Sequence, residues 1–149
     1  MNELINSLKA AHASNFAFYL KAHNFHWNVE DDDFPMYHEF FGNLYEEVYS
    51  AVDKIAELIR TLDEFAPGTL NLISSMSVIP EDINIPSADE MVRILFTDNQ
   101  RLLSALIETY KLAEKYSEFG VSNAIQDRIE AHKKHAWMLR SMLKEEANG

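Results

Sequence analysis

Apolar residues recur at intervals of three and four positions along most of the chain, which is the spacing of one face of an α-helix. The first such stretch predicts a helix over residues 2–28, and the second predicts a helix over residues 35–62. At a rise of about 1.5 Å per residue the second helix would be about 42 Å long, a length typical of helical bundles. The pattern therefore predicts an all-α chain.

A short acidic break separates these two helices. Asp31, Asp32 and Asp33 precede Phe34 and Pro35. Proline is tolerated in a first helical turn because its missing N–H would have no partner there. Asp33 is the better chemical candidate for the N-cap, and Phe34 is the alternative.

A long crossover is predicted over residues 63–86, which contain three of the four prolines. We expect a short helix inside it, near residues 69–77. A connection of this length permits the next long helix to run parallel to the one before it. Ser87 and Glu90 then form a capping box, in which each side chain satisfies a free backbone N–H of the other, and a third helix follows to about Tyr116.

Gly120 predicts the turn before a fourth helix over residues 122–145. Four long helices with a long connection between the second and the third predict a ferritin-like four-helix bundle. At 149 residues the chain is most simply one domain, covering residues 1–149, and it is long enough to bury a sizeable core.

The composition indicates which classes of partner and which cellular compartment to expect. Thirteen basic residues against twenty-four acidic ones give a net charge of −11, which favours cations and disfavours nucleic acid. The N-terminal residues lack the basic and apolar regions of a signal peptide, and no apolar run approaches the roughly 20 residues that span a bilayer. The chain has no cysteine, which fits a reducing compartment. We therefore expect a cytoplasmic protein that does not contact membranes.

Two carboxylates and two histidines are the candidate metal ligands. Asp53 and Glu57 are one helical turn apart, so their side chains project from nearly the same side of the second helix. A cation between them would reverse the mild repulsion of this pair. His26 and His38 add imidazole, and carboxylate with imidazole suits first-row metals such as iron, manganese or zinc. The alternative for the acidic pair is a solvated surface shared with neighbouring basic side chains.

Helical rise limits how these residues can meet. His38 and Asp53 are fifteen positions apart, which is about 22 Å along a straight helix. They therefore cannot bind one metal ion within one chain. If two chains pack about a two-fold axis with their second helices antiparallel, the histidine end of one can meet the carboxylate end of the other. We expect a site at a dimer interface, present twice.

Several segments resemble the Dps family of miniferritins, in the same order over nearly the whole chain: HNFHWNV at 23–29, His38-Glu39, DKIAE at 53–57 and HAWMLR at 135–140. The resemblance implies a homo-oligomeric hollow shell, usually a dodecamer. Such a shell acts as a ferroxidase: it oxidises Fe(II), commonly with hydrogen peroxide or alternatively with oxygen, and stores the ferric product. This activity would protect the cell against oxidative stress.

The resemblance also implies roles for single residues. Asp53 and Glu57 of one subunit would bind iron together with His26 of the partner subunit, and His38 would assist at a weaker second iron position. The chain lacks any Glu-x-x-His, the motif that the larger ferritins and bacterioferritins use in their bundle cores. No residue is assigned to haem.

Gly42 departs from the family pattern, which typically has an aspartate four residues after the second histidine. A glycine inside a helix costs about 1 kcal/mol relative to alanine, and it supplies no metal donor. The second iron position is then weak, water-filled or lost. The alternative function is a non-catalytic or weakly active metal-binding shell or interaction protein with a degraded ferroxidase site.

Other residues have two interpretations each. By the resemblance Trp27 should lie near the oxidation site, where an aromatic ring could accept an electron and limit radical escape, and the alternative is interface packing. His23 either supports the site or is a hydrogen-bonded, partly buried histidine. His132 and His135 have ligand spacing, but the two lysines between them repel a cation, so we assign both to structure.

DNA binding gives the Dps family its name, and members that bind DNA often use a lysine-rich tail. Here Lys9 is the one lysine in the first twenty residues, and Lys144 stands beside Glu145 and Glu146. A net charge of −11 per subunit should repel the phosphate backbone. We predict no direct DNA binding.

Overall fold

The computed structural model describes the backbone of residues 1–148 and the side chains of residues 1–144. Within these residues the chain is helical and contains no strand. The helices in chain order are α1 (Asn2–Asn28), α2 (Phe34–Tyr49), α3 (Val52–Thr61), α4 (Leu70–Met76), α5 (Ala88–Lys115) and α6 (Phe119–Asn148). None of the described helices is long and apolar enough to cross a membrane.

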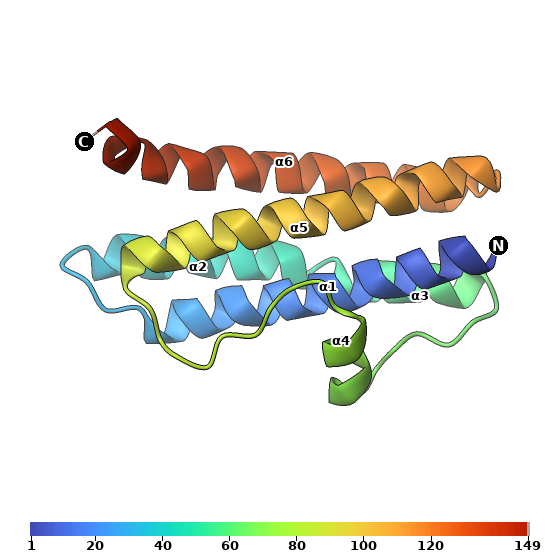
Figure 1. Ribbon diagram of the computed structural model, residues 1–149, viewed down its shortest axis with the longest axis horizontal. Helices are drawn as coiled ribbons and strands as arrows, with labels where there is room; N and C mark the ends of the chain where they lie inside the picture. Colours follow the sequence, from blue (N-terminus) through green and yellow to red (C-terminus); the bar gives the residue numbers. More distant parts are fainter. Residues whose placement is uncertain (149) are drawn as a thin grey trace.

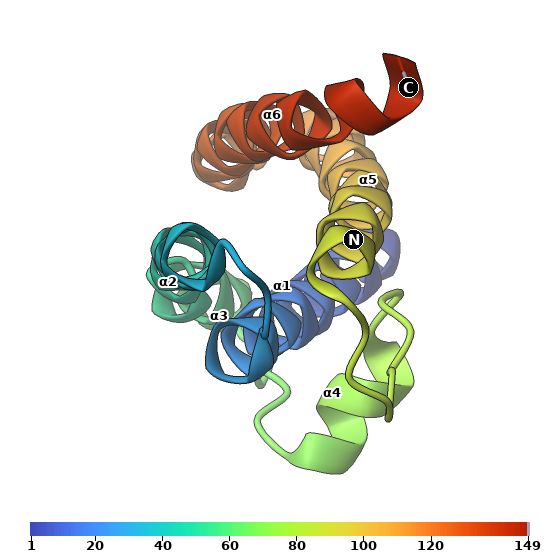
Figure 2. The same ribbon diagram turned by 90° about the vertical axis from the view of Figure 1, so that its left-hand side faces the viewer.

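The helices form a four-helix bundle, as predicted. Figure 1 shows α1, α5 and α6 running the length of the molecule, with α2 and α3 following one another along the fourth position. In the end-on view of Figure 2, α4 lies outside the bundle, beside α1. The crossover brings the chain back along the whole bundle, so α5 runs in the same direction as α2 and α3 (Figure 1). The parallel return that the crossover length permits is therefore present.

Local sequence signals explain most helix ends. α1 has the predicted bounds, and Asp33 is the N-cap residue of α2. The Ser87 side chain accepts a hydrogen bond from the Glu90 backbone N–H, with 3.3 Å between the two atoms, at the start of α5. The predicted short helix is α4, and Thr69 caps it through its side chain.

The single helix predicted over residues 35–62 is wrong, because the helix breaks at Ser50 and Ala51. The Asn15 side-chain amide of α1 donates to the Val48 carbonyl at 3.3 Å, and the Ser50 hydroxyl donates to the Glu47 carbonyl at 2.5 Å. The Ala51 backbone N–H then bonds to Val48 across three residues instead of four. Side-chain insertion into the ladder of backbone hydrogen bonds is a general cause of helix breaks.

The turn between α5 and α6 also differs from the prediction. Gly120 lies in the first turn of α6, and the connection is formed by residues 116–118. Ser117 adopts the left-handed conformation there, with φ of 57°. Its N–H bonds to the Glu114 carbonyl and the next N–H bonds to Ala113, which together form a Schellman motif. Serine thus takes the place that glycine was expected to fill.

Apolar side chains from all four bundle positions meet in one core. The largest fully buried side chains include Phe18 and Phe25 of α1, Phe41 of α2, Ile55 and Ile59 of α3, Leu95, Leu102 and Leu106 of α5, and Ile125 of α6. Since α1 and α2 pack together through Phe25 and Phe41, the corner between them is held from the inside.

Candidate metal site

Two histidines meet at the corner between α1 and α2. Nδ1 of His26 lies 2.7 Å from the backbone oxygen of His38, and Nδ1 of His38 lies 2.7 Å from the backbone oxygen of His26. The rings stack with their centroids 3.8 Å apart. Because a carbonyl only accepts, both imidazoles donate from Nδ1, and in the neutral form each keeps the lone pair of Nε2. This is the usual way in which a hydrogen bond orients a histidine for a metal ion.

Gly42 of α2 makes room for this pair. The residue is buried, and a Cβ atom built on it would stand 3.1 Å from both Cε1 and Nδ1 of His26. Ordinary contacts between such atoms are longer, so any side chain here would push the imidazole. The glycine therefore has a packing reason inside the helix, and it leaves this position without a donor atom.

Asp53 and Glu57 lie on α3, beyond the helix break, and both are exposed. Figure 1 shows that the α1–α2 corner and α3 lie toward opposite ends of the bundle. Among the described residues, no group of three or more histidine, cysteine, aspartate or glutamate side chains could hold a metal ion. One chain thus brings His26 to His38 and sets Asp53 beside Glu57, and it does not bring the two pairs together.

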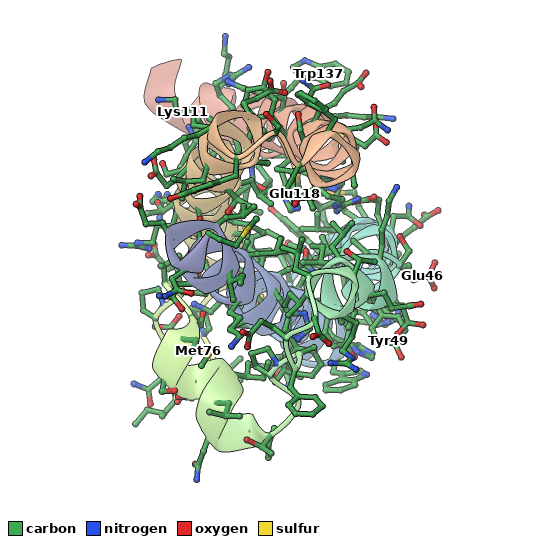
Figure 3. All side chains as sticks on the ribbon, turned by 90° about the vertical axis from the view of Figure 1, so that its right-hand side faces the viewer. Glu46, Tyr49, Met76, Lys111, Glu118 and Trp137 are labelled. Carbon is green, nitrogen blue, oxygen red and sulfur yellow. The ribbon has the colours of Figure 1, made fainter. Side chains whose placement is uncertain are left out.

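A group of aromatic rings extends from His26 along the same side of α1 and α2. The His23 ring stacks on Tyr45, with 3.8 Å between centroids, and lies tilted against Trp27, with 3.9 Å between centroids. Tyr45 also lies 5.2 Å from His26, between ring centroids. The Tyr19 hydroxyl lies 3.0 Å from Nδ1 of His23. We call Tyr19, His23, Trp27, Tyr45 and Tyr49 the aromatic array; Figure 3 shows Tyr49 at the outer edge of the bundle.

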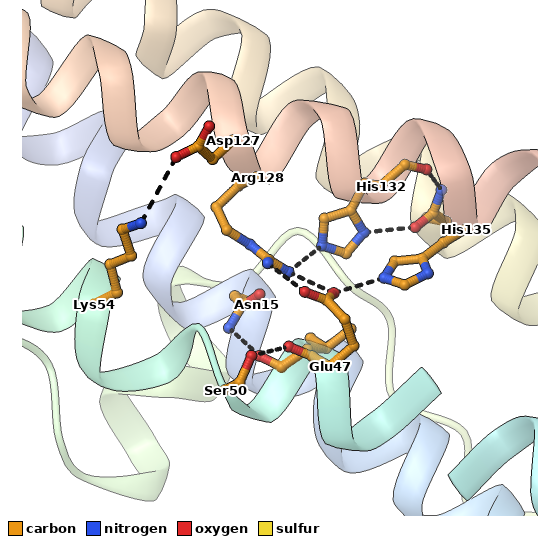
Figure 4. A network of polar contacts seen from close by, with 10 residues as sticks. Asn15, Glu47, Ser50, Lys54, Asp127, Arg128, His132 and His135 are labelled. Atoms are coloured by element: carbon orange, nitrogen blue, oxygen red, sulfur yellow. Dashed lines mark hydrogen bonds and ion pairs between the residues drawn. The ribbon is translucent and has the colours of Figure 1, made fainter. Parts of the chain in front are cut away.

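Sequence reasoning missed a polar network inside the bundle (Figure 4). Glu47 of α2 accepts two hydrogen bonds from Arg128 of α6, at 2.6 Å and 2.9 Å. It accepts a third from Nε2 of His135 at 2.6 Å. His132 donates from Nδ1 to the Asn99 side-chain oxygen at 2.7 Å and lies 3.3 Å from Arg128. The Arg128 guanidinium thus neutralises the Glu47 carboxylate.

The electrostatics of this network follow from burial and pairing. Burial alone would raise the pKa of Glu47, but hydrogen bonds and charge from His135 and Arg128 outweigh it and hold the pKa far below its ordinary value. Burial, then the charges of His135 and Arg128, lower the pKa of His132. In the sequence, the helical spacing of Arg128, His132 and His135 indicates that these side chains share one side of α6. It does not indicate that Glu47 of α2 is their partner.

A groove of about 490 Å³ lies between α1, α4 and the crossover. Apolar side chains such as Leu20, Ile73 and Ile83 line it, and Lys21 lies at its base. The Lys21 ammonium is 2.6 Å from Asp98 and 2.9 Å from Asp82, and it also donates to the Pro80 carbonyl at 2.6 Å. Lys21 therefore fastens the crossover to α1 and α5.

Comparison with known proteins gives consistent results. A family model described as a ferritin-like domain matches residues 5–147. DNA protection during starvation protein 2 of Bacillus anthracis is 30% identical over 141 residues, which cover 95% of this chain and 97% of that protein.

Solved structures show the same similarity. The crystal structure of Dps from Staphylococcus aureus superposes with a TM-score of 0.91 at 28% identity, covering 96% of both chains. Dps from Vibrio cholerae O1, described as a member of a broad superfamily of ferritin-like diiron-carboxylate proteins, superposes with a TM-score of 0.91 at 25% identity and covers 95% of this chain and 89% of its own.

Proposed function

The chain belongs to the Dps group of the ferritin-like family, and from this premise we propose that it is a cytoplasmic ferroxidase that oxidises Fe(II) and stores the ferric product in a shell of its own copies. Membership of this group supports iron storage and ferroxidase chemistry in general terms. The resemblance drawn from the segments at 23–29, 38–39, 53–57 and 135–140 is thereby confirmed at the level of the family. The proposal treats residues 1–149 as one domain.

The observation that carries the proposal is the separation of two half-sites. His26 and His38 present imidazoles oriented by their Nδ1 bonds, and Asp53 with Glu57 presents two exposed carboxylates on another part of the bundle. Each pair alone has too few donors for a tightly held iron ion. We propose that His26 of one subunit completes the site formed by Asp53 and Glu57 of the other, with His38 as an auxiliary ligand.

A second copy of the chain is the proposed cover for the apolar face around the groove. Four large apolar residues are prominent there: Leu20 is 44% exposed, Trp27 57%, Leu70 77% and Ile83 94%. An exposed patch of this kind marks an interaction surface. Trp27 follows His26 directly in α1, so we propose that the interface extends from this face to the histidine pair. Twelve subunits remain the expected number for the complete shell.

The chemistry follows from the donors. Carboxylate oxygen and imidazole nitrogen bind Fe(II) and stabilise Fe(III) more strongly, because the carboxylates carry negative charge. Hydrogen peroxide, or oxygen, takes the electron, and we propose that one Fe(II) binds firmly because Gly42 supplies no donor for a second. The acidic balance of −11 per subunit favours entry of the cation. We propose that no haem takes part.

Mixed shells test the split site directly. One variant carries His26→Ala, and the other carries Asp53→Ala and Glu57→Ala; each alone should oxidise Fe(II) no faster than the protein-free solution. Co-expressed in equal amounts, they should recover about a quarter of the wild-type rate, because half of the two-fold pairs are mixed and each mixed pair rebuilds one of its two sites. A mixture as slow as its parents would reject the site, and circular dichroism checks that each variant folds.

Gly42 favours the second candidate, a shell that binds metal without oxidising it. Anaerobic loading with Fe(II) followed by a pulse of peroxide separates the two candidates. Rapid appearance of Fe(III) that Asp53→Ala and Glu57→Ala abolish supports the ferroxidase. Binding without oxidation supports the passive shell.

Direct binding to duplex DNA is not part of the proposal. The relative from Bacillus anthracis has DNA protection in its name, but this chain has a net charge of −11. The side chains of Glu145 and Glu146, which offset Lys144, lie outside the described residues. Retardation of duplex DNA by the protein in a gel at physiological salt would contradict this expectation.

A further inference from the structure

A second groove, which the proposed iron chemistry does not use, lies between α2 and α6. It consists of two adjoining hollows of about 390 Å³ and 500 Å³, which share the side chains of Phe40, Asn43 and Met138. Met36 and Met142 also line the larger hollow, so half of the six methionines of the chain meet here. We call this feature the methionine groove. Methionine also fills irregular apolar gaps, so the thioethers alone have a packing explanation.

His135 adds an open imidazole nitrogen to this groove. Its Nε2 lies 2.6 Å from the Glu47 carboxylate, and its Nδ1 has no hydrogen-bond partner among the described residues. Figure 4 shows this second nitrogen turned away from Glu47. The side chain is 10% exposed and lines the smaller hollow together with Met138. Because the ionised carboxylate only accepts, Nε2 carries the proton, and the neutral ring keeps the lone pair of Nδ1 for a ligand.

Helical spacing places these donors in a row. His135, Met138 and Met142 are three and four positions apart, so they lie on one face of α6. Met36 of α2 lies across the groove, in the same hollow as Met138 and Met142. Met36 is 47% exposed and the other two methionines are half-buried, so an ion from solution can reach them. One imidazole nitrogen and three thioether sulfurs therefore line a single accessible groove.

These donors select a soft cation of low charge. Thioether sulfur favours Cu(I), whereas Mg²⁺, Ca²⁺ and Mn²⁺ favour oxygen ligands. The Glu47 carboxylate is already paired with Arg128. Lys134 lines the smaller hollow and Glu39 lines the larger one, so their charges oppose each other. Lys134 also repels a divalent cation about twice as strongly as a monovalent one.

We propose that the methionine groove binds Cu(I). Met138 is the ligand common to both hollows, His135 supplies nitrogen through Nδ1, and Met36 and Met142 supply further sulfur. The proposed step is binding alone, so copper stays Cu(I) and no electron is transferred. The site uses none of the residues assigned to iron and does not depend on the ferroxidase proposal. The protein would then sequester copper as well as iron.

Anaerobic titration with Cu(I) tests the site. The protein, kept reduced with ascorbate, competes for Cu(I) with a chromogenic chelator, and we expect one tightly bound Cu(I) per subunit. X-ray absorption at the copper edge should show sulfur as well as nitrogen neighbours. Met138→Leu nearly conserves volume and removes the shared sulfur, so it should weaken Cu(I) binding by about tenfold or more. Met76→Leu, on α4 outside the groove, is the matched control and should change neither measurement.

Two further variants locate the metal ion. Met36→Leu combined with Met142→Leu should reduce the sulfur signal and keep the nitrogen signal. His26→Ala should bind Cu(I) as the wild type does, because the α1–α2 corner is not part of the groove. Circular dichroism checks that each variant folds.

Four results would overturn the inference: no binding of Cu(I) by the wild type, copper with nitrogen and oxygen neighbours alone, wild-type affinity in Met138→Leu, or loss of binding in His26→Ala. The last result would place the copper at the histidine pair. Each of them leaves the ferroxidase proposal standing, since that proposal is tested by oxidation of Fe(II).

Discussion

Gly42 lies so close to His26 that a Cβ atom at position 42 would stand 3.1 Å from Cε1 and Nδ1 of the imidazole. A side chain at position 42 would therefore crowd the His26 ring, which would have to shift by a few tenths of an ångström. The His26 ring is held by its hydrogen bond to the His38 carbonyl and by stacking on the His38 ring. A shift of the ring would therefore disturb these contacts between α1 and α2. Two substitutions at position 42 separate the effect of crowding from the effect of a donor.

Gly42→Ala should weaken Fe(II) binding by displacing His26, although alanine favours the helix by about 1 kcal/mol. Gly42→Asp causes the same crowding and adds a carboxylate, so it should bind more Fe(II) per subunit than Gly42→Ala does. Anaerobic titration calorimetry gives both the affinity and the stoichiometry. Equal stoichiometry for the two variants would show that the aspartate cannot reach a second iron position.

Glu47→Gln should destabilise the protein at neutral pH by about 2 kcal/mol, because it leaves Arg128 buried with a weaker partner. Since Glu47 is 36% exposed, the cost is smaller than for a fully buried pair. The pKa of Glu47 is lowered in the folded state, so its contribution is complete above the ordinary value of 4.5 and is lost as the pH falls below it.

The difference in free energy of unfolding between wild type and Glu47→Gln should therefore shrink below pH 4.5, measured by urea denaturation at fixed protein concentration. Glu46→Gln is the matched control, because Glu46 is the exposed neighbour on the same helix (Figure 3). An equal loss in both variants would contradict the assigned role of the network.

His132 should make the free energy of unfolding depend on pH at higher values than Glu47 does. It is fully buried, and its pKa is lowered well below 6.5. Just below pH 6.5 the His132 side chain therefore binds a proton in the unfolded chain but stays neutral in the folded chain. Its contribution is present above pH 6.5 and is lost as the pH falls below that value. His132→Gln should reduce the loss of stability between about pH 7 and pH 5 by about 1 to 2 kcal/mol. An unchanged pH profile would contradict this prediction.

Lys21→Met should cost about 2 kcal/mol in stability, because it removes the ammonium from Asp98, whose side chain is 2% exposed and keeps Arg101 as its remaining charged partner. Lys9→Met is the control: its ion pair with Glu64 is 3.6 Å long and more exposed, so its loss should cost less than about 1 kcal/mol. Urea denaturation compares the two. Lys21→Met should also speed proteolysis near Ile83, since Lys21 holds the crossover at Pro80 and Asp82.

The sequence predicted the bundle because amphipathic periodicity and end signals are local. The bounds of α1, the N-cap at Asp33 and the cap at Ser87 all follow from neighbouring residues. The break at Ser50 does not follow from them alone, because it includes a hydrogen bond from the Asn15 side chain of another helix. Ser117 was missed since a serine in the left-handed conformation has no strong sequence signal.

Some features of the candidate site could likewise be predicted from the sequence, and others required the structure. Helical rise was enough to show that His38 and Asp53 cannot cooperate in one chain, and the ligand assignment stays a prediction. The packing reason for Gly42 required the position of His26, sixteen residues away on another helix. Glu47 finds its partners 81 and 88 residues along the chain, a distance over which residue pattern carries no contact information.

The mutual bonds between His26 and His38 have a consequence for timing. They orient two ligands within a single folded chain, before any partner is present, whereas the carboxylates belong to a different half-site. Under the proposed division of ligands, a newly synthesised subunit holds a preorganised half-site that cannot perform iron chemistry. Assembly itself would then switch the reaction on, so that oxidants are consumed only where a shell is already closed around the product.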